Sequence, residues 1–335
     1  SKLDYLQELG VNGIWFMPIH PSKSYHKYDV SNYNAIDPAY GSLDDFRDLL
    51  AECEQRDIHV ILDLVLNHTG SDHHWFTAAC DYLRALPEGK EPSSEECPYL
   101  DYYYFSREQE ATWYYPVTGT GWYYEGKFSP DMPDLRLENG LVRQEIDAIM
   151  AYWLGMGVDG FRLDAAKEFY SGNTPMNVEV LSWLQETATS IKSDAYMVAE
   201  VWEASYTTLA NYYQSGFNSI FNYVYGNGMG KLIVTLNSRG NPAMVNDYAS
   251  EMQFINNAFE KKHPDYIDAP FTSNHDVGRI YGFAGRDFIN VLEDIGIDAI
   301  NPLMNKYCDL IKKAASDKDT EKEDKQLDKA ISLLS

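Results

Sequence analysis

The chain has 335 residues, 44% of them hydrophobic and 14% aromatic, which is sufficient for the core of a large globular domain and argues against a disordered protein. Its 51 acidic and 27 basic side chains give a net charge of −24, which argues against nucleic acid as the ligand and favours a neutral or cationic one. Most of the 26 tyrosines and 7 tryptophans are expected in the core, but flat amphipathic rings also stack on sugars.

The four cysteines, Cys53, Cys80, Cys97 and Cys308, are too few and too scattered for a disulfide scaffold or a paired-cysteine metal site. Cys80 and Cys97 are near enough in sequence to pair, although free thiols are the favoured alternative. No apolar run is long enough to span a bilayer, and no signal peptide precedes the first residues. Oligomeric state stays open, and an extracellular location is slightly favoured over a cytoplasmic one.

The first part of the chain alternates between strand and helix patterns. GIWFMPI (13–19) and IHVILDLVL (58–66) are continuous apolar runs, which are typical of parallel strands covered on both faces. Between them, residues 42–56 have helical spacing and open on a capping box formed by Ser42 and Asp45. The aromatic, turn-rich stretch from Thr69 to Asp131 is too long for an ordinary loop and predicts a small inserted domain.

Alternation then resumes to residue 276. Helices are predicted over 141–157, 178–192, 204–214 and 244–259, and strands over 158–164, 196–202, 218–223 and 269–276. Repeated strand and helix units predict an α/β fold, either a doubly wound sheet or a (β/α)8 barrel of the TIM type. Six strand candidates would make that barrel incomplete. The charge-dense stretch after Asp309 predicts a solvated helix.

Four of the predicted strands end in polar clusters. These are Asp63 with Asn67 and His68, Arg162 with Asp164, Glu200, and His275 with Asp276. In a parallel barrel the carboxyl ends of the strands face one shared mouth, so the carboxylates of Asp164, Glu200 and Asp276 would converge. A lone carboxylate at a strand end is more often a helix cap or an ion pair, but the joint pattern favours catalysis.

Converging carboxylates suit one reaction in particular. Like charges in a partly dry site raise one another's pKa, so one group can stay protonated as an acid while another stays ionised as a nucleophile. Retaining glycoside cleavage requires this division of roles. Arg162 lies two residues before Asp164, on the same strand face, and can keep that aspartate ionised.

Five short stretches carry a family resemblance. DLVLNH (63–68), GFRLDAAK (160–167), AEVW (199–202) and SNHD (273–276) resemble, in order, the four signature regions of the α-amylase family of retaining α-glucan enzymes. MPDL (132–135) resembles an additional short motif of that family. The resemblance runs from the first residue to about Asp276. It implies a (β/α)8 barrel with an inserted domain after the third barrel strand.

The resemblance also implies a domain division. Residues 1–68 and 132–285 would form the catalytic barrel, 69–131 the inserted domain, and 286–335 a divergent, largely helical charged segment. The family's first barrel strand would precede Ser1, and no counterpart of its last strand is recognisable after Arg279. We therefore expect the chain to be a fragment.

Residue roles follow from the matched motifs. The resemblance implies that Asp164 is the nucleophile, Glu200 the general acid and then base, and Asp276 a group that holds the sugar hydroxyls. The other implied contacts with substrate are His68, His275, Arg162, Tyr28, Lys167 and Trp202. Asn67 is the candidate ligand of a structural Ca²⁺ ion, although Glu168 stands where many calcium-dependent relatives have a histidine.

The expected function is that of a retaining glycoside hydrolase acting on α-1,4 bonds of α-glucans or maltooligosaccharides. The alternatives within the family are an exo-acting α-glucosidase, an oligo-1,6-glucosidase or a transglycosylase. A non-catalytic glucan-binding fragment is the alternative from a different class. Such relatives typically lose one or more of the three carboxylates, and all three are present in this chain.

Overall fold

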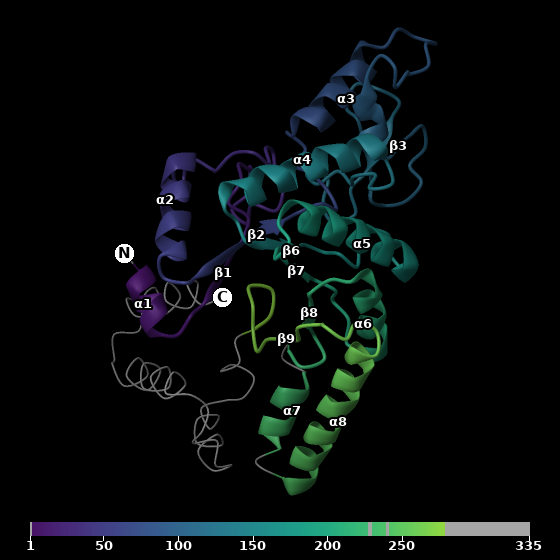
Figure 1. Ribbon diagram of the computed structural model, residues 1–335. Coiled ribbons are helices and arrows are strands. Elements are labelled where there is room, and N and C mark those ends of the chain that lie inside the picture. The colour runs from purple at the N-terminus through teal and green to yellow at the C-terminus, as the bar shows by residue number, and fades with distance from the viewer. Residues whose placement is uncertain (1, 227–229, 239–240, 279–335) are drawn as a thin grey trace, which may run out of the picture. The chain divides into compact units, whose positions relative to one another are not determined.

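The computed structural model describes residues 2–226, 230–238 and 241–278 (Figure 1). The chain divides into two compact units. The larger unit contains Asn12–Val201 and Gln214–Ser219, and the smaller unit contains the remaining segments. The predicted C-terminal segment 286–335 and the predicted tail helix lie outside the described residues.

Four parallel strands form the centre of the larger unit. Its strands β1 (Gly13–Phe16), β2 (His59–Leu64), β6 (Gly160–Leu163) and β7 (Tyr196–Ala199) lie side by side in that order. All four residues of β6 are buried, as expected for a strand covered on both faces. The pairing places the carboxyl ends of β2, β6 and β7 at one edge of the sheet.

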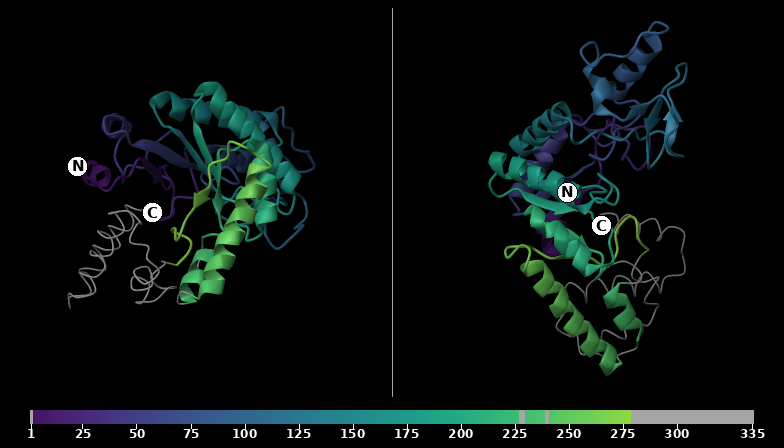
Figure 2. Two further views of the ribbon diagram at one scale, coloured as in Figure 1. Left: turned by 60° about the horizontal axis from the view of Figure 1, so that its bottom comes forward. Right: turned by 90° about the vertical axis from the view of Figure 1, so that its right-hand side faces the viewer.

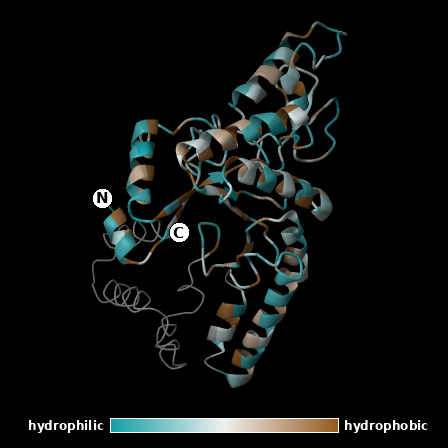
Figure 3. Cartoon of the chain, viewed as in Figure 1, coloured by the Kyte–Doolittle hydropathy of each residue, from teal (hydrophilic) through white to brown (hydrophobic). Residues whose placement is uncertain are grey.

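Three helices of the larger unit follow or precede these strands: α2 (Leu43–Glu54), α4 (Gly140–Met156) and α5 (Thr174–Ile191). The capping box of α2 is confirmed, because the Ser42 side chain accepts from the Asp45 amide and Asp45 accepts from the Ser42 amide. Hydrophilic and hydrophobic residues alternate along α2 (Figure 3), and Phe46, Leu50 and Cys53 are its buried residues. Helix α5 begins earlier than predicted because Asn173 caps it by accepting from the Met176 amide.

The stretch between β2 and α4 forms its own small elements. They are α3 (His74–Ala85), the 3₁₀ helix η1 (Pro98–Tyr102), and the antiparallel strands β3 (Phe105–Ser106), β4 (Tyr114–Pro116) and β5 (Tyr123–Glu125). Aromatic rings fill the space between them: the Phe76 ring lies 5.1 Å from Tyr103 and 4.7 Å from Tyr124. Cys80 and Cys97 are buried free thiols.

The smaller unit is mostly helical. It contains α1 (Leu3–Glu8), α6 (Tyr206–Tyr212), α7 (Lys231–Asn237) and α8 (Pro242–Glu260), the long green helix of Figure 2. The 3₁₀ helix η2 (Tyr213–Ser215) and strand β8 (Ser219–Asn222) cross from one unit to the other in sequence, and β8 pairs in parallel with β9 (Ala269–Pro270). None of the helices in the described part of the chain is long and apolar enough to cross a bilayer.

In the smaller unit one prediction was wrong in extent and one helix was not predicted. The strand predicted over 269–276 covers only Ala269–Pro270, because Pro270 has no backbone N–H and Asn274 bonds the amides of Asp276 and Val277 in a turn. Helix α7 was not predicted, since its seven residues are too few to show a clear period.

Glycine at position 160 allows β6 and β7 to pair. A Cβ atom there would lie 1.8 Å from the carbonyl oxygen of Tyr196, its partner on β7.

We expect Gly160→Ala to lower the free energy of unfolding by about 2–3 kcal/mol, because the two strands must separate. Gly155→Ala is the matched control. A Cβ there meets nothing within 4 Å, so alanine in α4 should stabilise by about 0.5–1 kcal/mol. Urea unfolding followed by circular dichroism measures both, and equal effects would contradict this reading.

Candidate active site

A buried arginine at the carboxyl edge of the sheet binds three carboxylates. Arg162 is 1% exposed, and its Nη1 lies 2.8 Å from both carboxylate oxygens of Asp63 and 2.7 Å from Oδ1 of Asp164. Its Nη2 lies 2.9 Å from Oε2 of Glu200. Two of the three predicted catalytic carboxylates therefore share one guanidinium.

The strand register produces this cluster. Asp63 on β2 and Arg162 on β6 are direct partners across the sheet. Asp164 lies two residues beyond Arg162 and so on the same face of the chain. Glu200 directly follows β7, and its amide donates to the carbonyl of Leu163, the last residue of β6.

A sharp turn after β6 holds the Glu200 carboxylate in addition to Arg162. Ala165 has a φ of 46°, in the left-handed region that non-glycine residues rarely adopt. In this conformation the Ala165 amide donates to Oε2 of Glu200 at 2.9 Å, and the Ala166 amide donates to the Glu200 backbone carbonyl. This turn could not be predicted from the residue type, because alanine is not a typical left-handed residue.

The cluster has one positive charge for three negative ones. Burial raises the pKa of Asp63 to about 6 and that of Asp164 to about 8, while the Arg162 guanidinium opposes both increases. The repulsion of Glu200 adds to both increases. Burial and repulsion thus favour a protonated carboxyl in the cluster while Arg162 favours an ionised one, and a site with one acid and one ionised carboxylate needs both influences.

Two aromatic rings enclose the guanidinium. The Cζ atom of Arg162 lies 5.0 Å from the ring centre of Trp15 and 5.8 Å from that of Tyr28. The Tyr28 hydroxyl donates to Oδ2 of Asp63 at 3.0 Å and accepts from Arg162 Nη1 at 3.4 Å. Trp15 and Asp63 were not among the predicted site residues. Asp63 is revealed by its pairing with Arg162 across the sheet, and Trp15 by the contact of its ring with the guanidinium.

His68 and Lys167 also belong to the larger unit. His68 is 2% exposed, its ring packs against the half-exposed Phe128, and burial lowers its pKa to about 4, so it is neutral. Its Nε2 has no hydrogen-bond partner among the described residues. The backbone carbonyl of Lys167 accepts from Asn177 at 2.8 Å. Neither contact tests the predicted sugar-binding roles, which stay predictions.

Three of the predicted site residues, Trp202, His275 and Asp276, belong to the smaller unit. Trp202 is 48% exposed and stacks on Tyr223 with the ring centres 5.0 Å apart. His275 Nε2 lies 3.1 Å from Oδ2 of Asp276, whose amide donates to Asn274. The predicted convergence of Asp276 with the carboxylates of the larger unit stays a prediction.

A pocket of about 320 Å³ lies beside Asn67 in the larger unit. Asn67 Nδ2 donates to Oδ1 of Asp134 at 3.2 Å, and both residues line the pocket together with Glu125 and Lys127. Calcium takes six to eight oxygen ligands, and these side chains offer at most five, one from Asn67 and two each from Asp134 and Glu125. The Lys127 ammonium, 3.6 Å from Glu125, would also repel a second cation. The fit is therefore partial, and calcium binding by Asn67 stays a prediction.

Comparison with known proteins identifies the family. The family model described as "Alpha amylase, catalytic domain" matches residues 1–305 of this chain. The chain belongs to the α-amylase catalytic-domain family. Alpha-amylase 3 of Dictyoglomus thermophilum is 38% identical over 289 residues, which are 85% of this chain and 53% of that protein. Glucan 1,6-alpha-glucosidase of Streptococcus dysgalactiae subsp. equisimilis is 32% identical over 312 residues, which are 86% and 54% of the two proteins.

Solved structures agree with this assignment. Amy13B of Eubacterium rectale is 44% identical, with a TM-score of 0.81 over 87% of this chain and 56% of that one. The α-amylase from H. orenii is 35% identical, with a TM-score of 0.71 over 85% and 58% of the two chains. The predicted barrel class is confirmed by this similarity. The chain spans about half the length of the curated relatives it matches.

Removing the shared cation tests the electrostatic account of the cluster. Arg162→Met leaves three carboxylates without a counter-charge, and we expect a loss of about 3–5 kcal/mol in the free energy of unfolding. The raised carboxyl pKa values set the pH dependence. At pH 5 the folded variant can hold protons on these groups, whereas at pH 8 it must give them up or keep buried charges unpaired, so the loss should be larger at pH 8.

Arg143→Met is the control for this measurement. Arg143 pairs with Glu179, whose side chain is 58% exposed, so its removal should cost about 1 kcal/mol or less and vary little with pH. Urea unfolding at the two pH values measures both variants. A loss for Arg162→Met that is the same at pH 5 and pH 8 would contradict the electrostatic account.

Proposed function

We propose that this protein is a retaining glycoside hydrolase that cleaves α-1,4-glucosidic bonds in α-glucans and maltooligosaccharides. The observation that supports this most is the sharing of Arg162 by Asp164 and Glu200, at 2.7 Å and 2.9 Å. The two carboxyl groups bond to the two terminal nitrogens of one guanidinium. This favours the short carboxyl separation of retaining enzymes over the wider separation that inverting enzymes need for a water molecule.

In the first step, a carboxylate oxygen of Asp164 attacks the anomeric carbon of the bound glucose. The bond from that carbon to the glycosidic oxygen breaks, and Glu200 donates its proton to the leaving oxygen. Burial raises the pKa of Asp164, and the bond to Arg162 opposes that increase and favours the ionised form that attacks. In the second step, Glu200 takes a proton from water, whose oxygen attacks the anomeric carbon and releases Asp164.

The other predicted residues have supporting roles. Asp276 and His275 would bind hydroxyls of the sugar at the cleavage site, and the neutral His68 has a ring nitrogen available for the same purpose. Tyr28 would provide an aromatic surface beside that sugar. Lys167 and the exposed ring of Trp202 would contact sugars on the leaving-group side.

The bond preference rests on the relatives. The D. thermophilum protein named an α-amylase has 38% identity, compared with 32% for a glucan 1,6-alpha-glucosidase and 31% for the 4-alpha-glucanotransferase of Thermotoga neapolitana. These names favour an endo-acting α-amylase. An exo-acting glucosidase and a transglycosylase remain the alternatives, because the same two carboxylates serve all three reactions.

Incubation of the chain with maltoheptaose tests the proposal. We expect mixed products from maltose to maltotetraose, with the new reducing end released as the α-anomer in early NMR spectra, since two inversions at one carbon give net retention. Glucose as the sole early product would instead identify an exo-acting glucosidase. Release of the β-anomer would rule out the covalent mechanism.

Replacing the nucleophile tests the residue assignment. Asp164→Asn removes the attacking charge but keeps the shape, so hydrolysis of maltoheptaose should fall by a factor on the order of 10⁴ or more while the sugar still binds. Glu186→Gln, an acid-to-amide change at an exposed position of α5, is the control and should leave the rate unchanged. Isothermal calorimetry and product chromatography measure binding and turnover separately. Near wild-type hydrolysis by Asp164→Asn would refute the assignment.

A further inference from the structure

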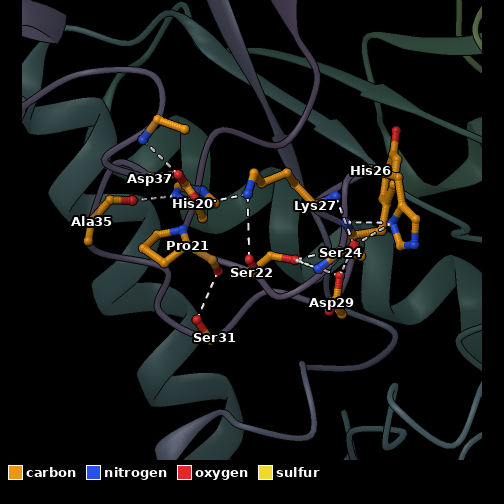
Figure 4. Close-up of polar contacts among 12 residues, drawn as sticks. His20, Pro21, Ser22, Ser24, His26, Lys27, Asp29, Ser31, Ala35 and Asp37 are labelled. Atoms are coloured by element: carbon orange, nitrogen blue, oxygen red, sulfur yellow. Dashed lines mark hydrogen bonds and ion pairs between the residues drawn. The ribbon is translucent and has the colours of Figure 1, made fainter.

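The loop over residues 20–37 places Tyr28 in the active site. The two ends of this loop, which form its base, are held together by hydrogen bonds. The Asp37 amide donates to the carbonyl of Ile19 at 2.8 Å, and the His20 ring lies 3.0 Å from the carbonyl of Ala35 (Figure 4). Tyr28 lies far along the loop from these contacts, and its hydroxyl bonds Asp63. The direction of Tyr28 therefore depends on the loop backbone around it.

The backbone just before Tyr28 has an uncommon conformation. Lys27 has a φ of 67°, in the left-handed region where glycine is favoured and a side chain is strained. A glycine would adopt this conformation without strain. The presence of lysine therefore needs a favourable contact of its side chain, and the structure supplies one.

The Lys27 side chain fastens the loop to its own base. Its Nζ donates to Oδ2 of Asp37 at 2.7 Å, and the two side chains are only 13% and 12% exposed. Asp37 is itself fixed, because its other carboxylate oxygen accepts from the Ala39 amide at 2.8 Å. An ion pair with this little exposure is screened much less than a surface pair.

Hydroxyl groups hold the residues on either side of Tyr28. The Lys27 amide donates to Oγ of Ser24 at 3.1 Å, and Ser22 and Ser24 both donate to the buried carboxylate of Asp29 (Figure 4). The Tyr28 amide donates to Nδ1 of His26. The chain is thus fixed both before and after Tyr28. The Lys27–Asp37 ion pair joins this part to the base of the loop, together with the hydrogen bonds that the Ser31 amide and hydroxyl donate to the carbonyl of Pro21.

We propose that Lys27 is a positioning residue of the active site, whose ion pair with Asp37 holds the left-handed turn that directs the Tyr28 hydroxyl onto Asp63 and Arg162. The inference rests on the proposed function, because the site it serves is the one assigned to glycoside cleavage. Lys27 acts on the substrate through Tyr28. Its removal should weaken turnover only as long as Tyr28 is present.

Substitutions at both ends of the ion pair test the proposal. Lys27→Gly keeps the backbone conformation and removes the ammonium, so we expect kcat/KM for maltoheptaose to fall about tenfold through misplacement of Tyr28. Asp37→Asn should have a similar effect, and Lys27→Arg should restore most of the activity. Lys23→Gly is the matched control in the same loop. The Lys23 side chain is 57% exposed and lies 3.9 Å from Asp72, and its loss should leave kcat/KM unchanged.

A double-substitution cycle separates positioning from a general loss of stability. In a Tyr28→Ala background, Lys27→Gly should cause no further loss in kcat/KM, because the side chain it positions is gone. A further tenfold loss in that background would overturn the proposal. So would a Lys27→Gly variant with wild-type kcat/KM in the presence of Tyr28.

Amide hydrogen exchange measures the effect of the Lys27–Asp37 ion pair on the loop independently of turnover. Peptides covering residues 24–30 should exchange at least several-fold faster in Lys27→Gly than in the wild type or in Lys23→Gly. If no variant hydrolyses glucans, the proposed function fails, yet faster exchange in Lys27→Gly alone would still support the role of the ion pair in holding Tyr28. Unchanged exchange in Lys27→Gly would overturn that role whether or not the wild type is active.

Discussion

The structure of the larger unit depends on burying one arginine among three carboxylates. A guanidinium that is 1% exposed has to satisfy its charge inside the protein, and Arg162 does so with Asp63, Asp164 and Glu200. Removing an ion from water is costly unless partners and hydrogen bonds are in place. The neighbouring strands must therefore hold their register, since a shift of one residue would move Asp63 to the opposite face of the sheet.

Local chain features near the cluster serve this arrangement. Gly160 lets β6 approach β7, and the left-handed Ala165 turns the chain so that its amide reaches Glu200. The loop that carries Tyr28 is closed at its base and places an aromatic ring against the guanidinium. Each of these features has a small unfavourable effect on the free energy of folding. The favourable buried contacts of the cluster can offset it.

Much of this architecture could be predicted from the sequence because it depends on the spacing of apolar residues and on residues that begin or end helices and strands. Continuous apolar runs predicted β1 and β2, and Ser42 with Asp45 predicted the start of α2. Features that depend on pairing across the sheet could not be predicted. The partnership of Asp63 with Arg162 requires the register, and the Ala165 turn follows from tertiary contacts rather than from the residue type. The early end of β9 at Pro270, by contrast, is a local effect that the strand prediction over 269–276 did not take into account.

The charge of the cluster also bears on the kind of chemistry it can assist. Asp63, Asp164, Glu200 and Arg162 sum to −2 when all are ionised and to −1 when one proton is held. A negative site repels an anionic ligand, consistent with the acidic chain as a whole, and gains little from a neutral sugar in its ground state. It interacts far more favourably with a sugar whose anomeric carbon becomes positive as the glycosidic bond breaks. Under the proposed function, the acidic excess around Arg162 stabilises the transition state more than the substrate, which is the condition for catalysis.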